Sequence, residues 1–535
     1  MVLQSWIDLV QLVKTDTIHV VSGVAVVFLA LQIALWLRSK GSSWTKVAPN
    51  VALKATGLSS SPLPIINTTL KFATNPGDFH DWLLMRCKDF QGRPFVMRTL
   101  GRPDVVILTT PESIEDVMKT HFESFPKGDY QYQLLGDTLG NGIFATDGTK
   151  WVHQRKVASH LFTARSLRES MTQVIRKHTV VLRGILHDAG TQSKSVNLFD
   201  LFNRFTIDAF TEIGFGVSTK SMDMEDQHPF QKAFDRVQRM MVLRFFRPVW
   251  FWKLQRVLQV GAERQLREDV QTINRMVLDI IAQSMQQRNV GSKASDTVNL
   301  VSLFLDNNYD KTTEDFDPQY LRDIVVNFLI AGRDSTAQAL TWFFRNVTMH
   351  PEVVAKIRAE IKGVLPGLMT GEMDTPTMDQ VQQLTYLEAA LKESLRLYPA
   401  VPVSSRVAAK DVVLSDGTLI RKGQSANIPE YARSRMEQFW GPDAASYNPD
   451  RWIDPVTGKL ITFSSYQFFV FNAGPRTCLG MHLALLEMKI VVASLLSHLD
   501  IEVLDPEKVT YDLSLTLPVR GQMRAHVVPL RAHAY

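Results

Sequence analysis

The sequence of 535 residues contains only two cysteines, Cys87 and Cys478. Two cysteines cannot supply the several cross-links on which small secreted domains rely, so the fold must depend on a hydrophobic core. A strong excess of one charge is also missing, because 59 Lys and Arg against 54 Asp and Glu give a formal net charge of +5. This excess is too weak to indicate nucleic acid and suits an anionic membrane or an acidic partner surface. With 45% hydrophobic and 21% charged residues, the composition is ordinary for a globular protein and does not indicate disorder.

One long apolar run lies near the start of the chain, from Ile18 to Leu37. A helix that spans a bilayer needs about 20 mostly apolar residues, which this run supplies. A cleaved signal peptide is the alternative, but the run is longer than a typical signal core and lacks a clear small-residue cleavage site. We therefore predict a membrane anchor. Arg38, Lys40 and Lys46 follow it, and the positive-inside rule then places the bulk of the chain in the cytoplasm.

The anchor divides the chain into parts. Residues 1–17 form an N-terminal segment and residues 18–37 the anchor. Residues 38–64 carry basic residues and the turn-rich stretch from Ser59 to Pro64, which predicts a stiff hinge. No further linker interrupts residues 65–535, which we interpret as one domain.

The second cysteine lies in a glycine-containing turn that runs from Phe471 to Gly480. Glycines allow the backbone to approach a large flat ligand, with amide groups that point at the sulfur of Cys478. A helix is predicted to begin at Met481, and its dipole would stabilise a thiolate that precedes it. A lone cysteine is more often a buried structural thiol. The full pattern Phe-x-x-Gly-x-Arg-x-Cys-x-Gly favours a ligand-binding loop instead.

This pattern resembles the cysteine-ligand loop of the cytochrome P-450 family at every fixed position, namely Phe471, Gly474, Arg476, Cys478 and Gly480. The resemblance implies that Cys478 is the axial ligand of haem b iron, that Phe471 shields the sulfur and that Arg476 pairs with a haem propionate. A thiolate ligand donates electron density and favours O–O cleavage, whereas a histidine would suit oxygen carriage. With one cysteine assigned to iron, no intramolecular disulfide remains, which favours a reducing compartment.

The resemblance extends to residues that would hold the haem carboxylates. Trp151 and Arg155 lie one helical turn apart and so on one face. Spacing alone favours a surface helix with an exposed arginine, but the Trp and Arg match a family helix that hydrogen-bonds a haem propionate. Arg406 lies where the family has another propionate-binding arginine, and Val401 and Val403 would then line the pocket near the haem.

A long helical pattern runs from Gln319 to His350 and contains Gly332, Asp334 and Ser335. A glycine inside a helix costs roughly 1 kcal/mol relative to alanine, and close approach of a flat cofactor or of O2 would explain it. The family pattern is Ala-Gly-x-Asp-Thr-Thr, which implies that Asp334 and Ser335 form a proton relay for O–O cleavage. Serine keeps the hydroxyl but lacks the methyl that limits its rotamers, which allows some leakage to peroxide. The alternative is a hydroxyl that bonds back to a preceding carbonyl.

An acid and a base at i, i+3 lie in the next predicted helix, Leu384 to Leu397. A solvated ion pair is the commonest explanation for Glu393 and Arg396. Together with Arg451, however, they resemble the Glu-Arg-Arg structural triad of the family. We assign the triad to folding, with no chemical step.

Other segments carry local predictions. Residues 94–100 and 104–109 predict a β-hairpin. The glycine-rich chain from Pro126 to Gly148 predicts an irregular loop that could line a pocket, and residues 513–518 resemble a terminal hairpin tip at the substrate pocket. The aromatic stripe from Met240 to Leu254 is either core packing or a loop at a membrane interface, where aromatic residues and cations gather. Both readings of the stripe stay open.

The resemblance implies a mainly α fold with a smaller β region and one haem. The implied reaction is monooxygenation, in which one atom of O2 enters a C–H bond and electrons come from NADPH through a cytochrome P-450 reductase, with cytochrome b5 as a further partner. The anchor suggests a single-pass protein of the endoplasmic reticulum whose catalytic domain lies in the cytosol and contacts membrane lipids.

Several stretches, such as Phe125 to Gly128 and Leu139 to Trp151, resemble the branch of the family that hydroxylates fatty acids and alkanes at the chain end. We predict terminal (omega) hydroxylation of long-chain fatty acids. Another lipophilic substrate, such as an alkane, sterol or xenobiotic, is the first alternative. A reductase-independent haem-thiolate isomerase or dehydratase, a non-catalytic haem sensor or lipid carrier, and a membrane scaffold without cofactor are the others.

Overall fold

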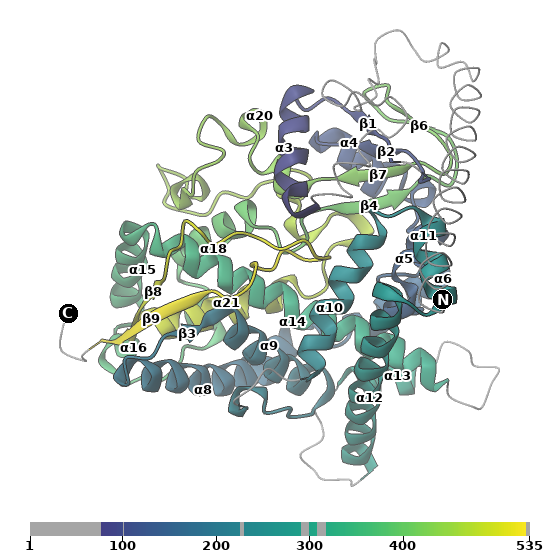
Figure 1. The fold of residues 1–535 in the computed structure, drawn as a ribbon. Helices are drawn as coiled ribbons and strands as arrows, with labels where there is room; N and C mark the ends of the chain where they lie inside the picture. Colours follow the sequence, from purple (N-terminus) through teal and green to yellow (C-terminus); the bar gives the residue numbers. More distant parts are fainter. Residues whose placement is uncertain (1–75, 100, 225–228, 290–298, 308–316, 531–535) are drawn as a thin grey trace, which may run out of the picture.

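Helices make up most of the computed structural model, which describes residues 76–99, 101–224, 229–289, 299–307 and 317–530 (Figure 1). A smaller region of strands lies at the upper right of the view, beside α3 (Phe79–Asp89). The expected mainly α fold with a smaller β region is confirmed. The predicted anchor at residues 18–37 and the predicted hinge lie outside the described residues. Within the ranges given above, no helix is both long and apolar enough to cross a bilayer.

Helix α14 (Pro318–Thr348) lies in the hydrophobic core and confirms the long helix predicted there. Its start is well defined, because the Asp317 side chain accepts a hydrogen bond from the Gln319 N–H at 2.9 Å and a proline fills the first position. The helix packs against α9 (Leu198–Phe215), α18 (Thr385–Leu397) and α21 (Met481–Leu496). It is buried on most of its faces, which is typical of a core helix.

The main sheet has the strand order β1-β2-β7-β4. Its strands are β1 (Phe95–Met97), β2 (Val105–Ile107), β4 (Ser404–Val407) and β7 (Ser425–Ile428). The predicted hairpin is confirmed, because β1 and β2 pair antiparallel with Val96 opposite Val106. β2 pairs parallel with β7, and β7 pairs antiparallel with β4, which carries Arg406. The sheet therefore holds one of the predicted haem-binding residues on a strand.

The glycine-rich segment after Pro126 is not the irregular loop that we predicted. Residues Gly128–Leu139 form helix α5. Gly128 has a left-handed φ of +74° and Gly140 ends the helix at +51°, so these glycines lie at the two ends. Gly136 inside the helix packs on the ring of Tyr132. The prediction failed because glycines suited to helix ends were interpreted as a continuous loop.

The remaining helices and strands complete the fold. The smaller sheets contain β3 (Val196–Asn197), β9 (Arg524–Pro529) and β8 (Leu499–Val503) in that order, and β5 (Val412–Val413) with β6 (Leu419–Ile420). The other α-helices are α4 (Pro111–Glu115), α6 (Gly148–Ser159), α7 (Ala164–Ser166), α8 (Thr172–Thr191), α10 (Pro229–Arg244), α11 (Val249–Leu258), α12 (Gly261–Asn289), α13 (Leu300–Asp306), α15 (Pro351–Val364), α16 (Pro366–Thr370), α17 (Met378–Val381), α19 (Glu430–Arg433) and α20 (Glu437–Trp440).

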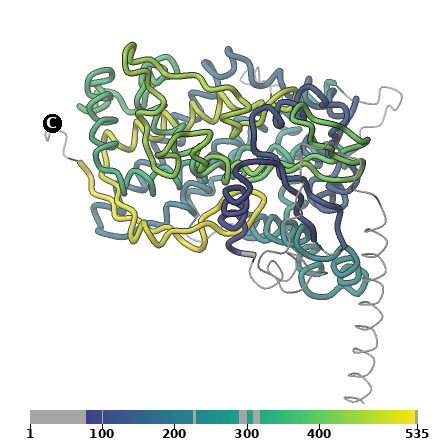
Figure 2. Tube along the Cα trace, turned by 90° about the horizontal axis from the view of Figure 1, so that it is seen from above, coloured from purple at the N-terminus to yellow at the C-terminus, as the bar shows by residue number. Residues whose placement is uncertain are grey.

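The C-terminal segment around residues 511–519 contacts both α3 and α14. Figure 2 shows it, in yellow, passing beside α3. The Tyr511 hydroxyl donates to Asp81 on α3 at 2.9 Å, and an isolated bridge pairs Tyr511 with Val519. The turn between them contacts α14, because the Gln338 amide donates to the Thr516 hydroxyl at 2.8 Å. The segment thus forms the hairpin-like turn that we predicted near residues 513–518.

The aromatic stripe from Met240 to Leu254 divides into two parts. Met241 and Trp252 are buried in the protein. Trp250 and Leu254, on α11, are exposed by 52% and 49%. Core packing is therefore confirmed for the inner side chains, the exposed part is a helix and not a loop, and its contact with a membrane stays a prediction.

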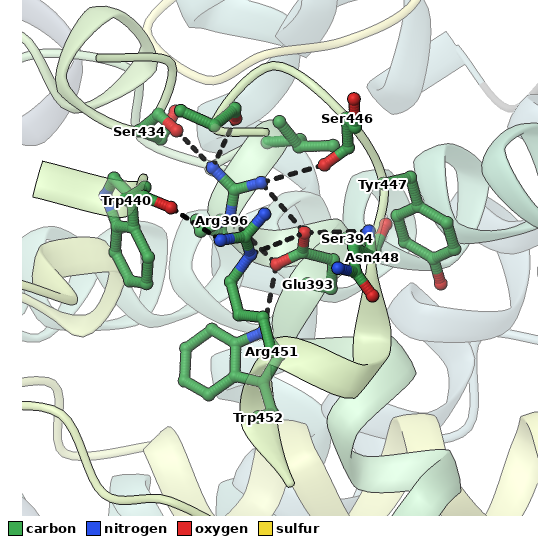
Figure 3. A network of polar contacts seen from close by, with 12 residues as sticks. Glu393, Ser394, Arg396, Ser434, Trp440, Ser446, Tyr447, Asn448, Arg451 and Trp452 are labelled. Atoms are coloured by element: carbon green, nitrogen blue, oxygen red, sulfur yellow. Dashed lines mark hydrogen bonds and ion pairs between the residues drawn. The ribbon is translucent and has the colours of Figure 1, made fainter. Parts of the chain in front are cut away.

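The Glu393–Arg396–Arg451 triad is a buried network, as Figure 3 shows. Arg396 Nε donates to Glu393 at 2.7 Å, and Arg451 Nε donates to the other carboxylate oxygen at 3.1 Å. The Trp452 indole also donates to Glu393 at 2.9 Å. Because the side chains of Glu393 and Arg396 are fully buried, the solvated ion pair is excluded and the structural assignment is confirmed.

Candidate active site

The Cys478 loop has a geometry that its glycines and the following helix determine. The Cys478 N–H donates to the Phe471 carbonyl at 2.8 Å, and α21 begins at Met481 as predicted. Gly474 has a left-handed φ of +64°, and a Cβ there would lie 2.1 Å from the Met118 carbonyl oxygen. Any larger residue at position 474 would therefore displace the loop from the neighbouring chain.

The two cysteines differ in accessibility. Cys87 is buried and burial raises the pKa of its thiol to about 12, so it is an inert core residue. The Cys478 side chain is accessible, yet it lies deep among protein atoms, and this burial raises the pKa of its thiol. The Gly480 N–H and the charge of Arg155 act in the opposite direction and lower that pKa. An accessible sulfur with an amide and a cation beside it is suited to act as a ligand.

Arg476 is held beside this sulfur by the start of α6. Its Nη2 donates to Asp147 Oδ1 at 2.5 Å and to the Thr146 carbonyl at 2.9 Å. Its guanidinium lies 4.3 Å from the centre of the Trp151 ring. Burial lowers the pKa of Arg476 to about 10, and its buried Nε has no hydrogen-bond acceptor in the described part of the chain.

Arg406 is a buried cation with few partners. Its side chain is almost inaccessible, and Nη1 donates only to the Ser405 carbonyl at 2.9 Å. Its Nε and Nη2 are buried without an acceptor among the described residues. Burial, and then the charge of Arg476, lower the pKa of Arg406 to about 9. Unpaired buried guanidinium donors are costly, so this site calls for an anion.

A third cation lies at the same place and was missed in the sequence. Burial, followed by the charges of Arg406 and Arg476, lowers the pKa of Lys127 well below its usual range. Asp147 is the acid that acts against these effects. Lys127 lies in the stretch Phe125 to Gly128, which resembled a family branch but carried no local signal for ligand binding.

Trp151 and Arg155 lie on one face of α6, as their spacing predicted. Trp151 is buried under Arg476. Arg155 Nη2 donates to the Thr477 carbonyl at 2.7 Å, beside Cys478. Arg155 is therefore a half-buried, hydrogen-bonded residue, although α6 also carries exposed side chains such as Val152. The role of Trp151 and Arg155 toward a haem carboxylate stays a prediction.

These residues fit a haem. Three cations, Lys127, Arg406 and Arg476, gather around the carboxylate of Asp147, and two of them have unpaired buried donors. This excess of positive charge matches the two carboxylates of haem, and the accessible Cys478 supplies the sulfur that haem iron would require.

On α14 the predicted relay residues have separate partners. Asp334 accepts hydrogen bonds from Gln238 Nε2 at 2.7 Å and from Arg333 Nη1 at 2.8 Å. Burial raises the pKa of Asp334 to about 6, although Arg333 acts against this shift. The Ser335 hydroxyl donates to the Ala331 carbonyl at 2.8 Å, which is the alternative that we named for this residue. The relay stays a prediction.

Asp334 also borders a pocket of about 210 Å³ between α9, α10, α14 and the C-terminal turn. The cavity is lined on its other sides by charged and polar residues that include Arg239, Gln338, Asp512 and Thr516. Phe199, Leu513, Pro518 and Val519 also line it, so its surface mixes polar and apolar side chains. Water in this cavity would lie next to the Asp334 carboxyl.

A glycine is required at position 332 for a reason other than the close approach of a cofactor or O2 that we predicted. A Cβ at this position would lie 2.1 Å from ring atoms of Phe210 on α9. The glycine therefore permits close packing of α14 on α9. The sequence showed that a reason was needed, but it did not show which neighbour required the glycine.

A buried acid near the proposed relay was not predicted from the sequence. Glu487 on α21 is buried, and burial raises its pKa to about 8, while a hydrogen bond with Thr336 acts against this shift. Thr336 directly follows Ser335. A single acid inside the apolar run that follows Met481 was the available signal, because an acid at such a position is buried with few partners.

Comparisons with known proteins show the family of the chain. A family model described as Cytochrome P450 matches residues 59–523. The chain is 35% identical over 424 residues to cytochrome P450 CYP94D108 of Paris polyphylla, an alignment that covers 78% of this chain and 82% of that protein. It is 33% identical over 511 residues to cytochrome P450 704C1 of Pinus taeda, which covers 92% of this chain and 95% of that protein. It is also 35% identical over 466 residues to cytochrome P450 94B1 of Arabidopsis thaliana, with 85% and 88% covered.

Proposed function

This chain belongs to the cytochrome P450 family of haem-thiolate monooxygenases, and from that membership we propose that it hydroxylates long-chain fatty acids at the chain end, at a membrane. In this proposal NADPH supplies the electrons through a cytochrome P450 reductase, and cytochrome b5 is a second donor. The observation that carries the monooxygenase chemistry is the accessible thiol of Cys478 beside a cluster of cations.

The protein residues have distinct tasks in this reaction. When bound, haem supplies the iron at which O2 is reduced and split. Cys478 would ligate that iron, and Arg406, Arg476 and Lys127 would hold the haem carboxylates. Asp334 can donate a proton near neutral pH because its pKa is raised to about 6. It can be reprotonated from water in the adjoining pocket, and the Ser335 hydroxyl would join the relay only on leaving the Ala331 carbonyl.

The environment of Arg102 supports the proposal that the substrate carries a carboxylate. It lies between β1 and β2, and its Nε and Nη2 donate to the Arg247 carbonyl at 3.0 and 2.7 Å. Its Nη1 donates to the Tyr130 hydroxyl on α5. These partners are all neutral, no acid pairs with Arg102 in the described part of the chain, and burial lowers its pKa to about 10. A fatty-acid carboxylate would supply the anionic partner that Arg102 lacks among the described residues.

A substrate-binding titration tests the role of Arg102. Arg102→Gln should raise the Kd of C12 to C18 acids about tenfold, the effect of losing one charge-assisted hydrogen bond, and leave the Kd of the matching alcohols unchanged. Arg98→Gln, at the neighbouring arginine that pairs with Asp104 at 3.4 Å, is the matched control. An equal change for acids and alcohols would remove Arg102 from carboxylate binding.

The outer face of α11 supports a membrane location. Trp250, Leu254, Val257 and Leu258 are exposed there, Val257 by 77%, and Lys253 lies on the same helix. Apolar and aromatic side chains with a nearby cation suit the boundary between lipid tails and headgroups. We place this face on the cytosolic side of the endoplasmic reticulum, with the apolar run at residues 18–37 as the anchor.

Product analysis tests the proposed function as a whole. The full chain is reconstituted with reductase, NADPH and a mixture of fatty acids, alkanes and sterols, and products are identified by mass spectrometry. Terminal hydroxy fatty acids that require NADPH are the expected result. Oxidation of another lipid class would correct the substrate, and turnover of lipid peroxides without NADPH would replace the monooxygenase by an isomerase or dehydratase.

A further inference from the structure

The carboxylate of Asp147 joins two parts of the active site that are far apart in the sequence. Oδ1 accepts a hydrogen bond from the Lys127 N–H at 2.9 Å, and Oδ2 accepts one from the Gly128 N–H at 3.0 Å. Oδ1 also accepts the Arg476 Nη2 donor at 2.5 Å. One side chain thus contacts both the start of α5 and the arginine next to Cys478.

Asp147 acts as a helix cap for a helix other than its own. It precedes α6, yet its side chain makes no capping hydrogen bond to α6. It binds instead the first amides of α5, whose own preceding residue, Lys127, offers no side-chain cap. An acid at a helix N-terminus satisfies orphan N–H groups and interacts favourably with the helix dipole. The start of α5 therefore depends on a residue that is also bound to Arg476.

The C-terminal half of α5 is bound by side chains from α14 and α10, on the side of the site that carries Asp334, here called the distal side. Arg322 Nη1 on α14 donates to the Thr138 carbonyl at 2.8 Å, and Asn327 Nδ2 donates to the Leu139 carbonyl at 2.8 Å. Arg244 on α10 donates to the Leu134 carbonyl at 2.9 Å. α5 thus connects the Cys478 side of the site, through Asp147, with the helix that carries Asp334.

The strand that carries Arg406 meets the same point. The Val407 N–H donates to the Pro126 carbonyl at 2.9 Å, so the residue after Arg406 is bound to the segment that leads into α5. A Cβ at Gly128 would lie 3.2 Å from the Val407 Cβ, which leaves little space between the two segments. A change in how Arg406 or Arg476 is held is therefore transmitted to the start of α5.

We propose that Asp147 is a positioning residue that couples the binding of the haem carboxylates to the placement of α5. It orients Arg476 toward the cofactor while it caps the helix that closes the distal side. The proposal rests on the haem-thiolate function proposed above. It assigns to Asp147 a task that no motif in the sequence indicated.

The test uses the haem-loaded full chain and two readouts. Hydrogen–deuterium exchange of peptides that cover residues 124–135 reports on the start of α5, and transfer of haem to apomyoglobin reports on cofactor retention. Asp147→Asn should raise both rates by roughly fivefold, because it removes the charge that interacts with Arg476 and the helix dipole and leaves one oxygen acceptor where two now accept. Asp129→Asn, at an exposed acid in the first turn of α5, is the matched control and should leave haem transfer unchanged and raise the exchange rate less than Asp147→Asn does.

Each outcome decides between roles. A faster exchange with unchanged haem transfer would make Asp147 a helix cap only, and faster haem transfer with unchanged exchange would make it a cofactor contact only. Either result, or no change in both rates, overturns the coupling. If Asp147→Asn does not fold, Asp147→Glu keeps the charge with a longer side chain, and the two rates should then change together. A wild-type chain that retains no haem would instead contradict the proposed function itself.

Discussion

Two clusters of buried arginines in this molecule differ in how their donors are satisfied. In the Glu393 cluster, Arg396 donates from all three nitrogens, to Glu393 and to the carbonyls of Ser434, Ala444 and Ser446. In the cluster near Cys478, Arg406 donates only from Nη1, and its Nε and Nη2 are buried without acceptors among the described residues. Both arginines are almost fully buried, so burial alone does not distinguish the clusters.

The difference separates a structural network from a ligand site. Buried donors in native proteins are nearly always paired, and a complete network braces the fold as it stands. An incomplete one becomes satisfied only when a ligand supplies the missing acceptors. The carboxylates of haem have the charge and the oxygen atoms that Arg406, Arg476 and Lys127 require.

The largest effect is expected from a variant that breaks the fully hydrogen-bonded Glu393 cluster. Glu393→Ala leaves Arg396 as a buried charge without an acid partner, while Arg451 keeps its ion pair with Asp443, and should lower the free energy of unfolding by about 3–5 kcal/mol. Thermal and denaturant unfolding of the purified protein measure it. Glu169→Ala, which breaks an exposed pair with Arg165, should change stability by less than about 1 kcal/mol. A comparable loss in both variants would show that the Glu393 cluster has no special structural role.

The second prediction concerns a buried acid with a single hydroxyl partner, Glu487. Its pKa is raised from 4.5 to about 8 in the folded protein, so the stability that it contributes is complete below pH 4.5 and is lost as the pH rises through about 8. Glu487→Gln removes this dependence. The stability of the variant relative to wild type should therefore increase by roughly 1.4 kcal/mol per pH unit within this window. A stability difference that does not vary between pH 5 and 8 would contradict the raised pKa.

The third prediction concerns the cluster near Cys478, where Arg406 has unpaired donors within the described residues. Arg406→Gln should speed haem transfer to apomyoglobin by about 10- to 100-fold, because hydrogen bonds to charged groups contribute about 1.5–3 kcal/mol. Haem-free protein should lose no stability, since the variant removes unpaired buried donors. Thermal unfolding of haem-depleted protein checks this second part. If the haem-free protein is destabilised as strongly as the haem-loaded protein, Arg406 belongs with the structural cluster.

How far the sequence predicted the site depended on whether the determining contacts are local. The Cys478 loop was predictable because its glycines, its arginine and the helix after it lie within one short stretch. The common face of Trp151 and Arg155 followed from helical spacing. In contrast, Lys127 approaches Arg406 and Arg476 only in the folded chain, and no periodicity indicates such an approach.

Errors in the prediction had the same origin. Glycines near α5 indicated a loop, but Gly128 and Gly140 lie at its ends and its cap comes from Asp147, far along the chain. Gly332 needed a reason, and the reason is Phe210 on another helix. Propensity and spacing describe local conformation, whereas caps and packing partners of this kind are tertiary contacts.

The smallest effect is expected at Ser335 on α14, whose hydroxyl is already hydrogen-bonded, unlike Nε and Nη2 of Arg406, which have no acceptor in the described chain. The Ser335 hydroxyl already has an acceptor, the Ala331 carbonyl, so its loss leaves no charge unpaired. Ser335→Ala should raise the ratio of hydrogen peroxide released to hydroxylated product by a few-fold, equivalent to about 1 kcal/mol in proton delivery. Ser335→Thr, which restores the family residue, should lower that ratio below wild type. An unchanged ratio in both variants would remove this hydroxyl from proton delivery.

The most direct test of the central claim is the reduced carbon monoxide difference spectrum of the purified full chain and of its Cys478→Ala variant. The account predicts the band of thiolate-ligated haem in the wild type and its absence in the variant. A wild-type protein without that band, or a variant that keeps it, would contradict the assignment of Cys478 and, with it, the interpretation of the unpaired arginines as a haem site.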